Sequence, residues 1–297
     1  MSYSTVCDAA AAGRLKGTGR SGKSQAGADQ ELFWSPNTFS FSNKTDAVSQ
    51  AAWNTAVAAG NLYYIGVIEE FDSNDTEPTF YESANGNLRL QTANAKRVRQ
   101  YRLVECACTH AALLSFDGQN GRLFVRTSNG YLRARIESDG TVRGFKTTQF
   151  DVGLKTAATT ETPAFTPIDV TYETPVDDDK DIFEDSIDFE FSQVDQIFNA
   201  EFAISSVASN GSNLTFTLTA TKDCSDAPLS GLTTSHVRFL DANGAAFGGA
   251  ITMPETGSTG VYSVDITTAE TVADVDIDGV QQVSSINYVS EQVRASV

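Results

Sequence analysis

The clearest pattern along the chain is a strict alternation of apolar and polar residues within the stretch 117–146. Leu132, Ala134 and Ile136 belong to one side of an extended strand, and the arginines between them belong to the other. A period of two is typical of a strand with one buried face. We therefore predict a β-meander with one apolar face and one basic face.

Two dipeptides divide this meander into hairpins. Asn129-Gly130 and Asp139-Gly140 are the pairs that type I′ turns favour, because both central residues of such a turn need a positive φ. The acidic stretch Asp72–Glu77 is predicted to be an exposed loop. Similar local patterns predict further strands at 61–69, 78–82, 87–91, 99–108 and 168–172.

The sequence AVSQAAWNTAVAA, which begins at Ala47, predicts one amphipathic helix. Asn43, Thr45 or Asp46 supplies its N-cap, and Gly60 stands where the helix should stop. A thin apolar stripe suited to packing on a sheet is formed by Ala47, Ala51, Trp53 and Val57.

The rhythm of strands and turns changes near residue 197. Beyond it, Ser, Gly and Asn turns recur about every ten residues, as in a small antiparallel sandwich, and strands are predicted at 202–207, 213–221, 235–240, 260–266 and 271–278. Residues 9–30 are small, polar and Gly-rich, with almost nothing to bury. We predict a mainly β chain with an extended N-terminal arm at 1–30, a β-rich assembly domain with one packed α-helix at 31–196, and a β-sandwich at 197–297.

Composition places the chain among folded proteins, because 40% of its 297 residues are hydrophobic and 20% are charged. The net charge of −17 is unevenly distributed: residues 1–155 have 17 Lys and Arg against 15 Asp and Glu, and residues 156–297 have 4 against 23. This balance argues against a protein whose whole surface binds nucleic acid or an anionic membrane. No apolar window is long enough to span a membrane, and we expect no signal peptide.

Residues 17–24, GTGRSGKS, match the phosphate-loop pattern letter for letter. That pattern binds phosphate when a buried strand precedes it and a helix follows it, and neither flank has that character. We interpret it as part of a flexible arm and not as a nucleotide site.

Cys106, Cys108 and His110 are spaced i, i+2 and i+4, which places three side chains on one face of a strand. A structural zinc site needs four ligands, and no second cluster supplies another. We therefore expect a core strand and no metal. The four cysteines show no framework spacing and are expected to be reduced.

Two acidic repeats look like the start of a calcium loop: Asp177-x-Asp179-x-Asp181, and the D-x-D-x-D-G sequence that begins at Asp274. Both lack the glutamate at position twelve, and the first also lacks the glycine at position six. A solvated acidic face is the favoured interpretation, with calcium as the alternative. No nucleophile elbow or HExxH motif is present, so we expect no enzyme activity, no catalytic residue and no cofactor.

The basic face of the meander has three interpretations: contact with the acidic run of an adjoining copy, nucleic-acid binding, or solvated surface. A nucleic-acid platform would normally add stacking aromatics, of which only Phe124 qualifies, so we favour contact between copies. The candidate inter-subunit residues are Arg122, Arg126, Arg133, Arg135 and Arg143 on the basic side, and Asp177, Asp178, Asp179, Asp181, Glu184 and Asp185 on the acidic side.

The passage from Phe116 to Arg122 (FDGQNGR), followed by Ser138 to Phe145 (SDGTVRGF), resembles a stretch of virion structural proteins from tailed phages of Bacteroidetes hosts. Independently, the last hundred residues resemble a bacterial Ig-like domain, on the sequence from Leu229 to Gly244 and on the residues that follow Gly260. Phage tail and capsid proteins often carry such domains on their surface.

These resemblances imply an N-terminal sandwich or barrel-like tube domain and a C-terminal Ig-like β-sandwich. We favour the tail tube: similar subunits form stacked hexameric rings around a β-barrel channel, join rings through long loops and terminal arms, and line the channel with acids so that DNA does not stick. The expected partners are copies of itself, other virion proteins and DNA in transit, without a membrane. The expected location is the virion tail, after assembly in the host cytoplasm. The alternatives are a capsid decoration protein, a head–tail connector and a glycan- or surface-binding adhesin.

Overall fold

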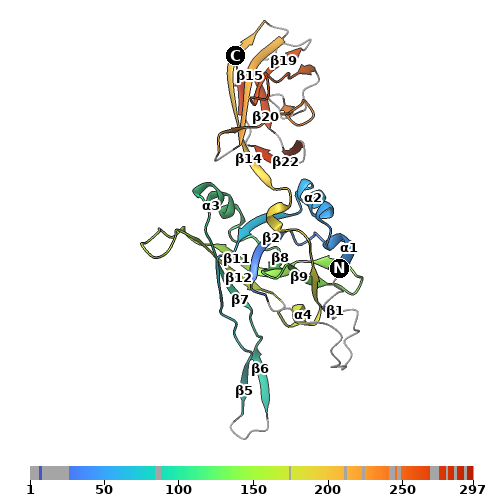
Figure 1. Cartoon of the computed structure of the whole chain (residues 1–297), viewed down its shortest axis with the longest axis vertical. Coiled ribbons are helices and arrows are strands. Elements are labelled where there is room, and N and C mark those ends of the chain that lie inside the picture. The colour runs from blue at the N-terminus through green and yellow to red at the C-terminus, as the bar shows by residue number, and fades with distance from the viewer. Residues whose placement is uncertain are drawn as a thin grey trace. The chain divides into compact units, whose positions relative to one another are not determined.

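The chain is mainly β, as the sequence predicts, and it divides into two compact units, Met1–Val194 and Asp195–Val297 (Figure 1). Of the predicted arm, Asp29 and Gln30 already belong to a strand, and the phosphate-loop pattern at 17–24 lies outside the described residues. The computed structural model describes residues 7–8, 27–83, 88–173, 175–210, 213–222, 225–240, 245, 249–267, 274–278, 280–283, 286–290 and 293–296.

The first unit is built on one antiparallel sheet of eleven strands, in which β11 joins two halves. β11 begins beside β8 at Phe145 and continues beside β12 as far as Val152. One half has the order β3, β2, β8, β9, β13, β1, with β10 beside β9, and the other has the order β11, β12, β7, β4. The strands are β1 Cys7–Asp8, β2 Asp29–Ser35, β3 Tyr63–Val67, β4 Glu70–Ser73, β7 Val98–Leu103, β8 Arg122–Thr127, β9 Tyr131–Ile136, β10 Val142–Arg143, β11 Phe145–Val152, β12 Thr166–Tyr172 and β13 Ile182–Ser186.

One apolar core of this unit combines residues from both halves of the sheet. Leu123 and Val125 of β8 belong to it, together with Phe150 of β11 and Val170 of β12. Phe124, between the two β8 residues, points the other way, because side chains alternate along a strand. The sheet is therefore apolar on both faces at β8.

The opposite face of β2 and β8 is covered by aromatic rings and by α2 (Gln50–Ala58). Trp53 of this helix is fully buried, and its ring centroid lies 5.2 Å from that of Phe33, 5.3 Å from that of Phe124 and 4.7 Å from that of Phe191. Rings at these separations add to the stability that burial alone gives. The packed helix predicted from the sequence is present.

The predicted single helix is in fact two, because α1 (Lys44–Ala47) ends before α2 begins at Gln50. Asn43 is the N-cap of α1, and its side chain accepts a hydrogen bond of 2.9 Å from the Asp46 N–H. Gly60 follows α2 with a φ of 69°, which glycine adopts without strain. The prediction of a buried Ala51 is wrong, because the buried face of α2 consists of Trp53, Ala56 and Val57.

The two hairpin turns of the meander differ from the predicted type. Gly130 and Gly140 have φ values of 76° and 86°, but Asn129 and Asp139 are not among the positive-φ residues of the described chain. The Gly130 N–H donates to the Thr127 carbonyl, and the Gly140 N–H donates to the Glu137 carbonyl, each at 2.9 Å. These are type I turns followed by a left-handed glycine, the usual form of slightly longer hairpin loops.

The strand predicted at 99–108 ends early. β7 stops at Leu103, and the short helix α3 (Ala107–Leu113) begins with Cys106 as its N-cap. The three side chains of the Cys/His motif are therefore on a helix and its cap, and their predicted placement on a strand is wrong. The predicted loop at Asp72–Glu77 is also wrong at its start, since Asp72 lies in β4.

The second unit contains two sheets. The larger has the order β18, β19, β15, β14, β22, β21, with β16 beside β15, and the smaller has the order β17, β20, β23. β14 is antiparallel to β15 and parallel to β22. The strands are β14 Ile197–Ser209, β15 Asn213–Lys222, β16 Ala227–Pro228, β17 Arg238–Leu240, β18 Ala250–Thr252, β19 Val261–Thr267, β20 Asp274–Asp278, β21 Val280–Val283, β22 Ile286–Ser290 and β23 Val293–Ser296.

The core of the second unit joins the two sheets. Phe216 and Leu218 of β15 and Tyr262 of β19 pack in one buried cluster with Phe239 of β17. The Tyr262 hydroxyl donates to the Leu229 carbonyl at 2.7 Å and accepts from the Leu232 N–H at 3.1 Å. A buried phenol thus holds the chain segment that precedes β17. In the described part of the chain, no helix has the length and apolar character needed to cross a membrane.

Candidate assembly surface and buried ion pairs

The basic face predicted from the meander is paired within its own chain. β9 lies beside β13, and Arg133 Nε is 3.0 Å from Glu184 Oε1. Arg135 Nη1 is 3.6 Å from Asp178 Oδ1, and its Nη2 is 3.4 Å from Asp181 Oδ2. The sequence analysis placed these acids against a neighbouring copy, whereas they contact arginines of the same chain. Their role between subunits stays a prediction.

Arg122 and Asp185, two further members of the predicted set, have partners close to them in the same chain. Arg122 is buried and donates to the Gly144 carbonyl at 3.1 Å. Burial, and then the charge of Arg143, lower the pKa of Arg122. Asp185 lies in β13 and accepts a hydrogen bond from the adjacent Ser186 N–H at 2.9 Å. Burial raises the pKa of Asp185.

The two acidic repeats for which calcium was the alternative interpretation lie largely outside the described side chains. Asp177 and Asp179 belong to the short helix α4 (Pro175–Lys180), and their side chains lie outside the described residues, as do those of the repeat that begins at Asp274. Among the side chains that the structure describes, no group of three or more His, Cys, Asp and Glu is arranged to hold a metal ion.

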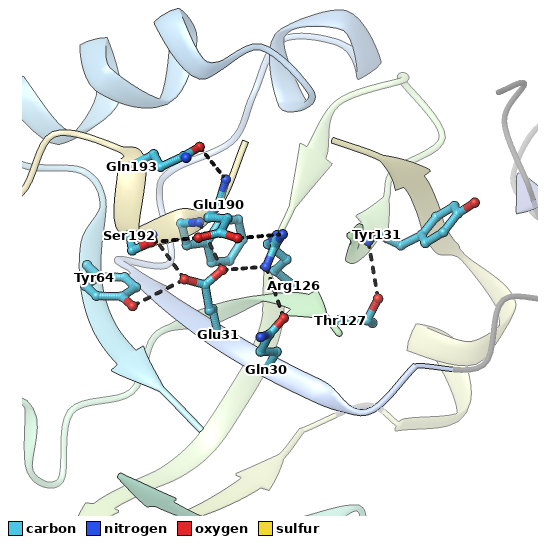
Figure 2. Close-up of polar contacts among 10 residues, drawn as sticks. Gln30, Glu31, Tyr64, Arg126, Thr127, Tyr131, Glu190, Ser192 and Gln193 are labelled. Carbon is cyan, nitrogen blue, oxygen red and sulfur yellow. Dashed lines mark hydrogen bonds and ion pairs between the residues drawn. The ribbon is translucent and has the colours of Figure 1, made fainter. Parts of the chain in front are cut away.

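Glu31 is the centre of a buried polar site that the sequence analysis missed (Figure 2). It lies in β2 opposite Arg126 of β8, and only 3% of its surface is exposed. Arg126 Nη1 donates to Glu31 Oε2 at 2.9 Å and to Gln30 Oε1 at 3.1 Å. Arg126 Nη2 also lies 3.9 Å from the exposed Glu190 carboxylate. The guanidinium is therefore held mainly by a buried ion pair.

The Glu31 carboxylate also accepts hydrogen bonds from the start of the short 3₁₀ helix η2 (Phe191–Gln193). The Phe191 N–H donates to Glu31 Oε2 and the Ser192 N–H to Glu31 Oε1, both at 3.1 Å. Glu190 and Gln193 complete a capping box, so the first N–H groups of η2 all find acceptors. We call Glu31, Arg126, Phe191 and Ser192 the Glu31 clasp.

The Glu31 clasp holds a strap, residues 187–194, on the aromatic face of the sheet. Its four apolar side chains, Ile187, Phe189, Phe191 and Val194, are buried. Tyr64 of β3 also donates to Glu31 Oε1, at 3.4 Å, and burial, followed by the Glu31 charge, raises the pKa of this phenol far above its usual value. Tyr64 therefore remains a donor at neutral pH. Two of the contacts to Glu31 position the backbone of η2, and the others join side chains of β2, β3 and β8.

A second acid, the partly buried Asp29, joins the two halves of the sheet. Tyr101 of β7 donates to Asp29 Oδ2 at 3.1 Å, and Arg133 Nη1 donates to Oδ1 at 3.3 Å. The Tyr101 and Tyr172 hydroxyls are 3.2 Å apart. Burial raises the pKa of both tyrosines, so they stay protonated and act as hydrogen-bond donors. This network links β2, β7, β9 and β12 and is structural.

Glu31 has a weak signal in the sequence. In β2, DQELFWS, Glu31 shares its face with Phe33, because the side-chain period of a strand is two. An acid on an apolar face is expected to have a buried partner. The partner itself, Arg126, was marked as part of a basic face, but sequence spacing does not show which strand lies beside it.

Cys106 and Cys108 differ in oxidation state. Cys106 is free and exposed, and hydrogen bonds from the Thr109 hydroxyl and N–H lower the pKa of its thiol. Cys108 is disulfide-bonded, so the prediction that all cysteines are reduced is wrong for this residue.

A two-stranded ribbon has exposed apolar side chains that lie outside the hydrophobic cores described above. β5 (Thr79–Glu82) and β6 (Arg89–Ala93) form a separate two-stranded sheet that continues from β4 and β7 and projects away from the rest of the unit (Figure 1). Tyr81 lies opposite Leu90, and Leu88 shares their face by the period of two. These three side chains are 55%, 51% and 46% exposed for Tyr81, Leu90 and Leu88. We call them the ribbon's apolar face.

The other face of the ribbon is polar. Phe80 lies opposite Gln91, and the Arg89 guanidinium covers the Phe80 ring at 4.2 Å from its centroid. Arg89 Nε also pairs with Glu82 Oε1 at 3.1 Å. The ribbon is therefore amphipathic: Arg89 and Glu82 pair on one face beside Phe80, which is 42% exposed, and the ribbon's apolar face has no such charged pair among its three side chains.

Comparisons with known proteins add little to this description. No protein-family profile matches the sequence, and no curated protein matches it. A solved structure described as "Marsupial T cell receptor" aligns over 93% of both chains, with 9% identity and a TM-score of 0.20. A TM-score this low supports no argument about the fold or function.

Proposed function

We propose that the chain is a structural subunit of a tailed-phage virion, most specifically the tail tube subunit, which assembles with copies of itself into stacked rings. The role requires no catalytic residue and no cofactor. A capsid decoration protein or head–tail connector would rest on the same property, self-assembly, and would differ in symmetry and in position in the particle.

The observation that carries this proposal is the open apolar face of the β5–β6 ribbon. An isolated two-stranded hairpin is marginally stable at best in water. The contacts within this one are exposed: the Arg89–Glu82 pair, the Arg89–Phe80 contact and a 3.0 Å hydrogen bond between the Thr79 and Thr92 hydroxyls. Exposed pairs of this kind contribute about 0.2–1 kcal/mol each. A partner that covers the apolar face would supply the burial that the ribbon lacks.

The sequence resemblance and the charge distribution support the same role. The residues that resemble phage virion proteins, Phe116 to Arg122 and Ser138 to Phe145, lead into β8 and span the turn after β9, β10 and the first residue of β11. The chain also has a net charge of −17, and an acidic surface suits a channel through which DNA passes without binding.

The test is electron microscopy of the purified full-length protein, together with light scattering over a range of concentrations. We expect rings or tubes of uniform diameter at high concentration. The variant Tyr81→Thr/Leu90→Thr should shift assembly to at least tenfold higher concentration, and the matched control Gln91→Thr should not. Threonine is used because it retains the strand propensity of the ribbon.

Two results would refute the proposal. One is a protein that stays monomeric at every concentration tested, with an intact N-terminus. The other is assembly that is equally strong in the Tyr81→Thr/Leu90→Thr variant, which would mean that the ribbon is not what brings copies together. A ring or cap with a symmetry incompatible with a tube would favour the connector or decoration role instead.

A further inference from the structure

The first unit has a second group of exposed apolar side chains, at the other end of β7. Val104 follows β7 directly and is 43% exposed, Leu154 follows β11 and is 86% exposed, and Leu114 follows α3 and is 42% exposed. We call these three residues the end patch.

The contacts of neighbouring residues bring the members of the end patch together. The Lys155 ammonium donates to the Glu105 carbonyl, which ties the residue after Leu154 to the residue after Val104. The Val152 N–H donates to the Asp117 carboxylate at 2.8 Å, which ties the end of β11 to the turn that follows α3. The three segments therefore meet at one end of the sheet.

The ribbon and the end patch lie at opposite ends of the same strand. The ribbon enters β7 at Val98, where the bridge between Thr76 and Lys96 leads into the sheet, and the end patch begins one residue beyond Leu103. Figure 1 shows β5 and β6 projecting on one side of β7 and α3 on the other. A contact that joins two different surfaces of identical chains is heterologous, and it repeats from copy to copy in a closed ring or an open stack.

We propose that the ribbon's apolar face on one copy docks on the end patch of the next copy. This inference rests on the proposed function, because it takes a second copy as the partner. Each chain has one ribbon and one end patch. Within a stack, the end patch of a copy contacts the ribbon of one neighbour, and its own ribbon contacts the end patch of the other neighbour. The polar face, closed by Arg89 and Glu82, stays toward solvent.

The size of the contact also points to a repeated assembly and not to an isolated pair. The described ribbon residues, 79–83 and 88–93, number eleven, whereas a stable pairwise interface uses about 20–30 residues on each side. One such contact is therefore weak, and several in a ring act together through effective concentration. The assembly should accordingly show a sharp concentration threshold.

The experiment is cross-linking between two distinguishable proteins, both carrying Cys106→Ser to remove the free exposed thiol. One protein, with an affinity tag, carries Leu90→Cys, and the untagged protein carries Leu154→Cys. They are mixed above the assembly threshold and treated with a short bismaleimide. The matched control replaces Leu90→Cys with Gln91→Cys, on the polar face, and a mixture without added cysteines measures the background.

We expect tagged–untagged dimers from the Leu90→Cys mixture at no less than five times the yield of the Gln91→Cys mixture. Leu154→Ser should also raise the assembly threshold, and Ala158→Ser, in the same loop, should not. Equal cross-linking yields in a mixture that forms rings or tubes would overturn the docking while the proposed function stands. No assembly at all by the unmodified protein would overturn the proposed function and the docking with it.

Discussion

The Glu31 clasp makes a quantitative prediction for the variant Glu31→Ala. The substitution removes a carboxylate that is 3% exposed and accepts four hydrogen bonds, from Arg126, Tyr64 and the Phe191 and Ser192 backbones. It leaves the Phe191 and Ser192 N–H groups without their acceptor and Arg126 without its buried counter-charge. The strap then loses its polar anchor while its apolar side chains still favour the bound position.

The expected loss in the free energy of unfolding is about 3–5 kcal/mol, the range for removing one partner of a buried ion pair. The Arg126 side chain is only 12% exposed, and its remaining partners are Gln30 at 3.1 Å and Glu190 at 3.9 Å. Each backbone N–H left without an acceptor costs about 1–3 kcal/mol if water cannot reach it. These costs overlap, since water that enters to serve one group serves the others, so we do not add them.

Tryptophan fluorescence during urea unfolding measures this loss specifically in the first unit. Both tryptophans of the chain, Trp34 and Trp53, lie in that unit and are buried. The change in the transition midpoint, multiplied by the slope of the transition, gives the free-energy difference. The control is Glu70→Gln, which disrupts an exposed ion pair with Arg102 and should cost less than about 1 kcal/mol.

A loss below about 1 kcal/mol for Glu31→Ala would refute the reasoning, because such a value is typical of a solvated pair. A double variant sharpens the test. Glu31→Ala/Arg126→Met removes the uncompensated charge and should be more stable than Glu31→Ala alone. If the double variant is less stable, the damage comes from lost packing and not from the buried charge.

Three further predictions concern other sites. Gly144→Ala would place a Cβ within 2.8–2.9 Å of Leu123 backbone atoms. The substitution should lower the free energy of unfolding by about 1–3 kcal/mol or more in the same urea assay. An unchanged free energy of unfolding would show that β8 and β11 move apart freely to make room for the Cβ. Tyr262→Phe loses both phenol hydrogen bonds and should cost about 2 kcal/mol in the second unit, seen by calorimetry as a lower transition temperature. Asp185→Asn should be more stable than the parent at neutral pH. Burial raises the folded-state pKa of Asp185, so the parent loses stability as pH rises above about 4. The difference in stability between the two proteins should vanish at lower pH, and a difference that persists there contradicts the burial argument.

The sequence was most informative where one local rule decides the structure. The alternation around Leu132, Ala134 and Ile136 predicted a strand with one buried face, and all three residues are buried in β9. Asn43, one of the three predicted N-cap candidates, caps α1, and Gly60 follows the end of α2 as predicted. In each case the signal lies within a few residues, so no knowledge of the tertiary partner is needed.

The predictions from the sequence were wrong or incomplete where contacts between distant segments determine the structure. Spacing alone did not separate a strand from a helix at Cys106, because small residues such as Ala107 and Ala111 fit both. The arginines were predicted to meet the acidic run of an adjoining copy, and Arg133 and Arg135 meet residues of that run within the chain. The sequence does not specify whether such charges meet within a chain or between chains. The register of β9 against β13 decides it, with Arg133 opposite Glu184.

The Glu31 clasp also determines how load would travel along the chain. The Gln193 carbonyl accepts a 2.8 Å hydrogen bond from Gln50, Val194 is buried, and the second unit begins at Asp195. Tension applied to the second unit therefore reaches the first unit at η2, where two backbone hydrogen bonds to one carboxylate resist it. Since the strap lies between the second unit and β13 along the chain, its contacts would bear that tension before the ladder of β13 does.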